Sequence, residues 1–191
     1  LAMMNIGRGF ARIYTKATTI LVDDPLFTFI GSGKILGGVP IQFVYMLVVI
    51  VISGLILNRT KFGRNIYAVG DNKQAASYSG INSRRVTMTV FVIMGIFASC
   101  AGILSSARTF SAQFNVGEGS EMDAISAVVL GGTSMSGGVG RLSGTIIGCI
   151  VIGVLNNGMN ILGIDSSWQY VVKGVVVLIA VFIDYIKKMK D

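Results

Sequence analysis

Residues 86–107 read VTMTVFVIMGIFASCAGILSSA, a stretch of 22 residues without a charged side chain. A helix needs about 20 apolar residues to cross the roughly 30 Å hydrocarbon core of a bilayer, so this stretch predicts a membrane-spanning helix. Residues 40–57, 142–164 and 168–186 predict three more spans in the same way. Because apolar stretches recur along the whole chain, we expect an all-α fold, a polytopic transmembrane helical bundle that forms a single domain over residues 1–191.

The composition of the chain agrees with a membrane location. The 191 residues are 52% hydrophobic and 13% charged, and the mean hydropathy is +0.72, whereas a soluble domain carries about a quarter charged residues. This balance excludes an ordinary soluble enzyme, a disordered chain and a nucleic-acid-binding protein, although the net charge is +7.

The residues that catalysis usually needs are scarce. The chain has no histidine, which removes histidine-based triads and metal sites. It also has no phosphate-binding loop of the Walker A type, because Lys34 is followed by Ile35 where that motif needs Ser or Thr. We therefore expect no catalytic residue, no metal, no cofactor and no nucleotide site of its own.

The first 22 residues are ambiguous. Arg8, Arg12 and Lys16 recur at a spacing of four among apolar residues, which is typical either of the end of a span or of a helix lying in the membrane interface. The chain opens at Leu1 without an initiator methionine, so we expect it to be part of a longer protein.

The basic residues predict the orientation of the bundle. Loop 58–85 contains six basic side chains against Asp71 alone, and by the positive-inside rule it is cytoplasmic. The C-terminal tail, which contains Lys187, Lys188 and Lys190, is expected on the same side. Three spans between these two cytoplasmic segments would leave the chain on the wrong side, so a fourth crossing is required.

Residues 122–141, MDAISAVVLGGTSMSGGVGR, are the candidate for that crossing. They are too short and too rich in glycine for a lipid-facing helix. We predict a short helix from about Met122 to Leu130, followed by a broken stretch from Gly131 to Gly140 that is buried in the bundle. Irregular backbone at membrane depth is tolerated only inside protein or beside a water-filled cavity, so a solute pathway is expected here.

Several side chains near this segment allow two interpretations. Asn156, Asn157 and Asn160 either offer amides to the hydroxyls of a neutral solute or hydrogen-bond neighbouring helices. Glu118, Glu121 and Asp123 either compensate the N-terminus of the short helix or lie at the entrance to the pathway. Lys173 is close enough to the outer end of the last span to snorkel. Small residues four apart, at Ala98, Gly102 and Ser106 and at Gly144 and Gly148, predict close helix packing.

The cytoplasmic loop contains a short helix signal at residues 71–81, DNKQAASYSGI. Asp71 is a suitable N-cap with Gln74 three residues later, and Gly80 suits the left-handed position after a helix. We expect one helix outside the membrane, on which the Ala75–Ala76 pair offers a nearly bare surface to a partner.

Ala75-Ala76-x-x-x-Gly80 in a basic loop resembles the coupling motif by which permeases of ABC importers dock on their ATPase. Three surrounding segments look like the permease subunit of ribose-type sugar ABC importers, over nearly the whole chain. They are FGRNIYAVGDNKQAASYSGIN, DAISAVVLGGTSMSGGVGRLSGTIIGCIVIGVLNNGMNILG and WQYVVKGVVVL. Gln74 replaces the glutamate of the motif, which weakens a maltose-type assignment and leaves the ribose-type assignment intact.

The resemblance implies roles for two groups of residues. Coupling to the ATPase would fall on Asn72, Ala75, Ala76, Gly80 and Ile81. The translocation pathway would be lined by Gly131, Gly132, Thr133, Asn156 and Asn157.

The resemblance also implies an activity and partners. The chain would be a multi-pass permease of the bacterial inner membrane with a cytoplasmic C-terminus, carrying a monosaccharide, with ribose as the first choice. It would contact lipid, a cytoplasmic ABC ATPase, an extracytoplasmic sugar-binding protein and a second permease subunit in a homodimer, but no nucleic acid. A permease for nucleosides or branched-chain amino acids and a facilitative carrier remain alternatives.

Overall fold

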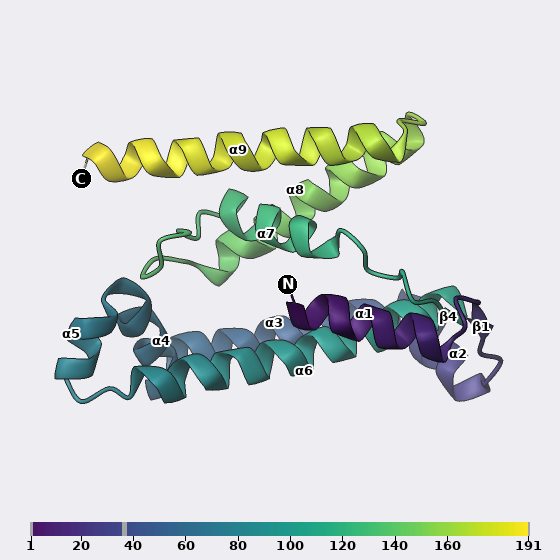
Figure 1. Cartoon of the computed structure of the whole chain (residues 1–191), viewed down its shortest axis with the longest axis horizontal. Coiled ribbons are helices and arrows are strands. Elements are labelled where there is room, and N and C mark those ends of the chain that lie inside the picture. The colour runs from purple at the N-terminus through teal and green to yellow at the C-terminus, as the bar shows by residue number, and fades with distance from the viewer. Residues whose placement is uncertain (1, 36–37, 191) are drawn as a thin grey trace. The chain divides into compact units, whose positions relative to one another are not determined.

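A computed structural model describes residues 2–35 and 38–190, with the side chains of the last helix described up to residue 182. Helices dominate the described chain, as the sequence predicts (Figure 1). They are α1 (Ala2–Tyr14), α2 (Pro25–Ser32), α3 (Ile41–Arg59), α4 (Lys61–Asp71), α5 (Lys73–Tyr78), α6 (Ser83–Thr109), α7 (Ser120–Leu130), α8 (Leu142–Ile161) and α9 (Ser166–Lys190).

Four strands of two residues each connect these helices and were not expected. They form two antiparallel pairs, β1 (Ile20–Leu21) with β4 (Ser111–Ala112) and β2 (Lys34–Ile35) with β3 (Val39–Pro40). Such short strands hydrogen-bond the backbones of connecting loops to each other, and the architecture remains helical.

The chain divides into two compact units. One contains Leu1–Ile52 and Met88–Glu118, and the other contains Ser53–Thr87 and Gly119–Asp191. The long helices α3 and α6 each contribute to both units. The candidate coupling and pathway residues all lie in the second unit.

Three of the predicted spans are confirmed as helices long and apolar enough to cross a membrane. The most apolar windows of α3, α6 and α8 have mean hydropathies of 2.3, 2.1 and 1.6. Only 6% of the window is buried in α3 and in α6, which no water-soluble fold would tolerate on this scale. The fourth predicted span, 168–186, coincides with α9, whose Ser166–Phe182 portion is apolar.

Helix α1 is too short to span a bilayer and has no buried residue. It carries Arg8 and Arg12, and the Arg12 guanidinium lies 5.5 Å from the centroid of the Phe114 ring. Lys16 is beyond the helix end, in a left-handed conformation with φ of 51°, so it does not continue the predicted stripe. The Arg12–Phe114 contact ties α1 to the segment that follows α6.

The second unit is built on close contact between α7 and α8. A Cβ placed on Gly148 would lie 1.9 Å from the Ala127 carbonyl oxygen, and one on Gly144 would lie 2.0 Å from the Gly131 carbonyl oxygen. The two backbones therefore touch, and the predicted packing at Gly144 and Gly148 is confirmed. By contrast, a Cβ on Gly102 would meet nothing within 4 Å among the described residues.

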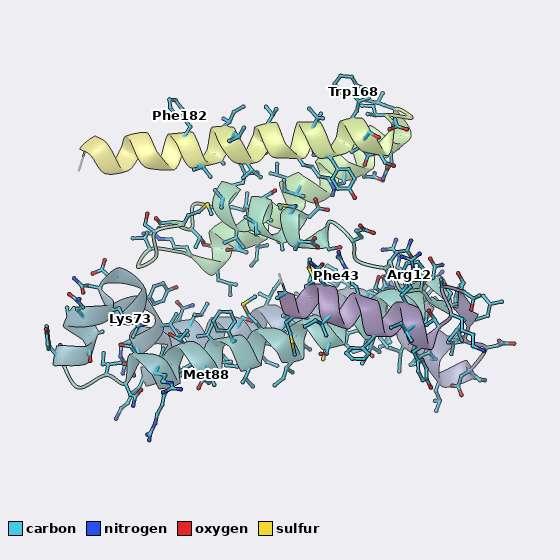
Figure 2. All side chains as sticks on the ribbon, in the orientation of Figure 1. Arg12, Phe43, Lys73, Met88, Trp168 and Phe182 are labelled. Atoms are coloured by element: carbon cyan, nitrogen blue, oxygen red, sulfur yellow. The ribbon has the colours of Figure 1, made fainter. Side chains whose placement is uncertain are left out.

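Helices α8 and α9 form an antiparallel hairpin (Figure 1). Gly163 takes the left-handed conformation in the turn, with φ of 67°. The Asp165 carboxylate then accepts a hydrogen bond of 2.8 Å from the Ser167 backbone N–H, and this bond lowers the pKa of Asp165. Trp168 and Phe182 project from α9 on the side away from α8 (Figure 2) and are exposed, at 65% and 64%.

The α7–α8 contact predicts a large difference between two glycines of α8. Gly148→Ala should destabilise the protein by about 1–3 kcal/mol because the new methyl group forces the backbones apart. Gly153→Ala is the matched control, since a Cβ there would meet nothing within 4 Å. Thermal unfolding in detergent would measure both variants, and equal stabilities would contradict the contact.

Candidate coupling and pathway site

The short helix in the basic loop is α5, and its N-cap is Asn72. The Asn72 side-chain oxygen accepts hydrogen bonds of 3.0 Å from the backbone N–H groups of Gln74 and Ala75. The predicted cap, Asp71, is wrong, because Asp71 is the last residue of α4. Asparagine caps a helix as well as aspartate does, so the two neighbouring candidates could not be separated by residue type.

The C-terminal end of α5 follows the prediction. Gly80 is left-handed with φ of 82°, and the Ile81 N–H donates to the Ala76 carbonyl oxygen at 3.0 Å. This is the hydrogen bond expected when glycine follows a helix end. Gly80 and Ile81 thus close α5 and lead the chain towards α6.

The alanine pair does not form one surface. Ala75 is exposed, whereas Ala76 is only 5% exposed. Adjacent residues of a helix point about 100° apart, so one of the two necessarily faces the protein. The bare surface predicted for the pair belongs to Ala75 alone, and Ala76 anchors α5.

A large aromatic side chain on the same helix was missed by the sequence analysis. Tyr78 is 90% exposed and lies two residues before Gly80. The surrounding cations are exposed as well, and Figure 2 shows Lys73 on α5. The residue was available to the prediction, since Tyr78 falls within the helix expected at residues 71–81, two positions after the Ala75–Ala76 pair. The exposed basic side chains of the 58–85 loop are Arg59, Lys61, Arg64, Lys73, Arg84 and Arg85.

Helix α4, which precedes α5, was expected to be loop. The Thr60 hydroxyl caps it by accepting from the Gly63 N–H at 3.0 Å. Gly63 also lets α4 fold back on the end of α3, because a Cβ there would lie 2.2 Å from the Leu57 carbonyl oxygen. An apolar helical pattern was present in the sequence at Phe62, Ile66 and Val69. The basic residues around it led to the prediction of a loop.

The end of α4 lies directly on the broken segment, residues 131–141. A Cβ on Gly137 would be 2.3 Å from the Gly70 carbonyl oxygen, and one on Gly138 would be 2.9 Å from the Asp71 Cα. The Tyr67 hydroxyl also donates to the Gly140 carbonyl oxygen at 3.1 Å. The C-terminal end of α4, which leads into α5, is therefore in backbone contact with residues 137–140.

The broken segment itself has the predicted form. Helix α7 ends at Leu130, and residues 131–141 form turns without regular helix. Gly132, Gly137 and Gly138 all have positive φ, at 81°, 93° and 75°. Local turns satisfy part of the backbone, because the Ser134 N–H donates to the Val139 carbonyl oxygen at 2.9 Å.

A cavity of about 340 Å³ lies between α4 and the broken segment. Thr133 is one of its lining residues, with Tyr67, Ser134 and Arg141. Gly131 packs on Gly144 beside it. A Cβ on Gly132 would meet nothing within 4 Å among the described residues, but the positive φ of Gly132 disfavours any side chain there. The structure thus brings three of the five predicted pathway residues to one region.

The other two predicted pathway residues lie elsewhere. Asn157 is exposed on α8. Asn156 faces α7, where its Nδ2 donates to Asp123 Oδ2 at 3.0 Å. Asp123 Oδ1 in turn lies 2.7 Å from Lys173 Nζ. Lys173 therefore pairs within the bundle rather than snorkelling, and Asp123 does more than compensate a helix terminus.

The three long apolar helices define a multi-pass helical membrane protein. The chain belongs to the family described as branched-chain amino acid transport system / permease component, whose model matches residues 1–181.

Relatives within this group include sugar permeases. The chain is 46% identical to the ribose import permease protein RbsC of Bacillus subtilis and 44% identical to that of Escherichia coli K12, over 96% of this chain and 58% of each relative. It is 37% identical to the L-arabinose transport system permease protein AraH of Escherichia coli K12, over 98% of this chain and 57% of the relative. The chain thus spans less than three fifths of their length. No solved structure matches it.

Proposed function

We propose that the chain is part of the membrane subunit of an ATP-driven ABC importer that carries a monosaccharide, with ribose as the first choice. The observation that carries this proposal is the backbone contact between the α4–α5 pair and the broken segment. An extramembrane helix joined directly to irregular membrane backbone can pass motion from a soluble partner to a solute pathway. The names of the related permeases favour a sugar over other solutes.

The proposed mechanism assigns the energy source to a separate protein. A cytoplasmic ATPase would hold α5, with Asn72, Ala75, Ala76, Gly80 and Ile81 giving the helix its shape and exposed face. Its ATP-driven motion would reach residues 137–140 through α4. The pathway would then open and close at Gly131, Gly132 and Thr133. Asn157, exposed on α8, would be open to the solute, whereas Asn156 would hold Asp123 of α7.

The remaining parts of the transporter follow from this scheme. A sugar-binding protein would deliver the solute from outside, and a second permease subunit would complete the channel. The protein would lie in the bacterial inner membrane with the basic loop and the C-terminus in the cytoplasm. The antiparallel α8–α9 hairpin supports this placement, because it returns α9 to the end of the second unit at which α8 begins.

The proposal is tested by uptake of labelled ribose into cells that contain the complete transporter. Uptake should stop when ATP is depleted and should persist in the presence of excess nucleoside or branched-chain amino acid. Uptake that continues without ATP would instead identify a facilitative carrier. Inhibition by either competitor would assign the pathway to that class of solute.

Tyr78 provides a separate test of the docking surface. A side chain that is 90% exposed outside the lipid is a suitable anchor for a pocket on a partner, and aromatic anchors contribute about 2 kcal/mol or more to binding. Tyr78→Ala should therefore weaken ATPase binding by roughly 30-fold or more, as measured by titration in nanodiscs. Tyr78→Phe should keep most of the affinity.

Tyr14 offers a matched control, because it is 86% exposed but lies at the end of α1. Tyr14→Ala should leave ATPase binding unchanged. An unchanged affinity in Tyr78→Ala, or an equal loss in Tyr14→Ala, would show that α5 does not bind the ATPase through this residue.

A further inference from the structure

Three helices of the second unit meet at a charged cluster made by Asp123 of α7, Asn156 of α8 and Lys173 of α9. Asp123 Oδ1 lies 2.7 Å from Lys173 Nζ, and Asp123 Oδ2 accepts from Asn156 Nδ2 at 3.0 Å. The side chains of Lys173 and Asp123 are only 14% and 29% exposed. Each oxygen of the carboxylate thus binds a different helix.

A second polar contact extends the cluster along α8 and α9. Gln169 Nε2 donates to Asn160 Oδ1 at 2.9 Å and to the Ile164 carbonyl oxygen at 2.9 Å. Asn160 lies one turn beyond Asn156 on α8, and Gln169 lies one turn before Lys173 on α9. The Gln169–Asn160 bond therefore links α8 and α9 close to their turn, and the Asp123 carboxylate links both helices to α7.

The Asp123–Lys173 ion pair is favourable only when both charges are present. An isolated ion among transmembrane helices is costly, whereas two opposite charges in contact offset much of that cost. Removing one partner leaves an uncompensated charge, and removing both leaves none. Helix α7 is only 11 residues long, so it cannot rely on spanning the lipid to hold its place, and the cluster supplies a fixed attachment near its first turn.

The position of α7 matters because the broken segment begins directly at its end. Residues 131–141 are attached to α7 at one end, and at residues 137–140 they lie on α4. If α7 could slide, motion arriving through α4 would move the helix and the segment together. If α7 is fixed, the same motion must deform the segment between its two attachments.

We propose that Asp123, Asn156 and Lys173 are positioning residues for translocation: they hold α7 against α8 and α9 so that motion delivered through α4 deforms residues 131–141. This inference rests on the proposed function. A direct contact with solute is the competing role. The structure favours positioning, because both oxygens of Asp123 are already bound, one by Asn156 Nδ2 and the other by Lys173 Nζ.

The test compares single and double neutral variants of the full-length permease, reconstituted with its ATPase and binding protein. Asp123→Asn and Lys173→Met should each lower the ribose moved per ATP hydrolysed by about tenfold. The double variant, which carries no uncompensated charge, should recover to within about threefold of the unaltered protein. Asp23→Asn is the control, since it removes an exposed carboxylate far from the cluster in sequence.

Hydrogen exchange of the α7 amides in the permease gives a second readout that does not depend on the solute. Exchange should rise by about tenfold in each single variant and return towards the original rate in the double variant. Should the single variants fail to insert, Asn156→Ala keeps the charge balance and should raise exchange and lower the transport ratio by about threefold.

The outcomes separate the two proposals. Unchanged exchange in the variants overturns the positioning role whatever the solute is. Faster exchange with an unchanged transport ratio overturns it as well, because the cluster would then be structural only. A double variant as inactive as Asp123→Asn points to solute contact and also overturns it. Absence of ATP-driven ribose uptake by the unaltered protein overturns the proposed function, while the exchange data still judge the cluster.

Discussion

The second unit depends on one constraint, which is that backbone polar groups shielded from water must find partners inside the protein. A helix meets this requirement by itself, but residues 131–141 are not helical. Local turns and the Tyr67 hydroxyl serve some of their polar groups, and their backbone packs closely on α4 and α8. Glycine makes these contacts possible, because any Cβ at Gly137, Gly144 or Gly148 would overlap a neighbouring backbone. The broken segment is therefore tightly held although it lacks regular structure.

This constraint explains why a pathway and a coupling element occur together. A segment whose backbone is held by neighbouring elements moves when those elements move. A regular helix, whose backbone hydrogen bonds are internal, does not depend on its neighbours in this way. Helix α4 is one such neighbour and continues directly into α5, whose exposed face contains Ala75 and Tyr78. Helix α7 is attached on the other side to α8 by backbone contact and to α9 by the Asp123–Lys173 pair. The proposed mechanism needs only these two attachments and a partner that moves one of them.

The sequence was sufficient for the features that depend on local pattern. Apolar length predicted α3, α6 and α8, and the requirement for a fourth crossing predicted the short helix ending at Leu130. The glycine after α5 was also predicted, because left-handed backbone favours that residue type. Features that join distant residues were not predicted. Gly70 meets Gly137, and Asp123 meets Lys173, across 50 or more residues, and no spacing rule links them. The cap was predicted at Asp71 instead of Asn72, because aspartate and asparagine cap helices equally well.

The central claim is that α5 and the inner end of the broken segment move as one body. Spin labels at Ser77 and Val139, both exposed, would report this motion. Pulsed electron paramagnetic resonance would measure the distance between the two labels in the assembled transporter. The account predicts that the distance between these two labels stays the same with and without ATP, while the distance from Val139 to a label at Met122 on α7 changes. A change in the first distance on ATP binding would contradict it.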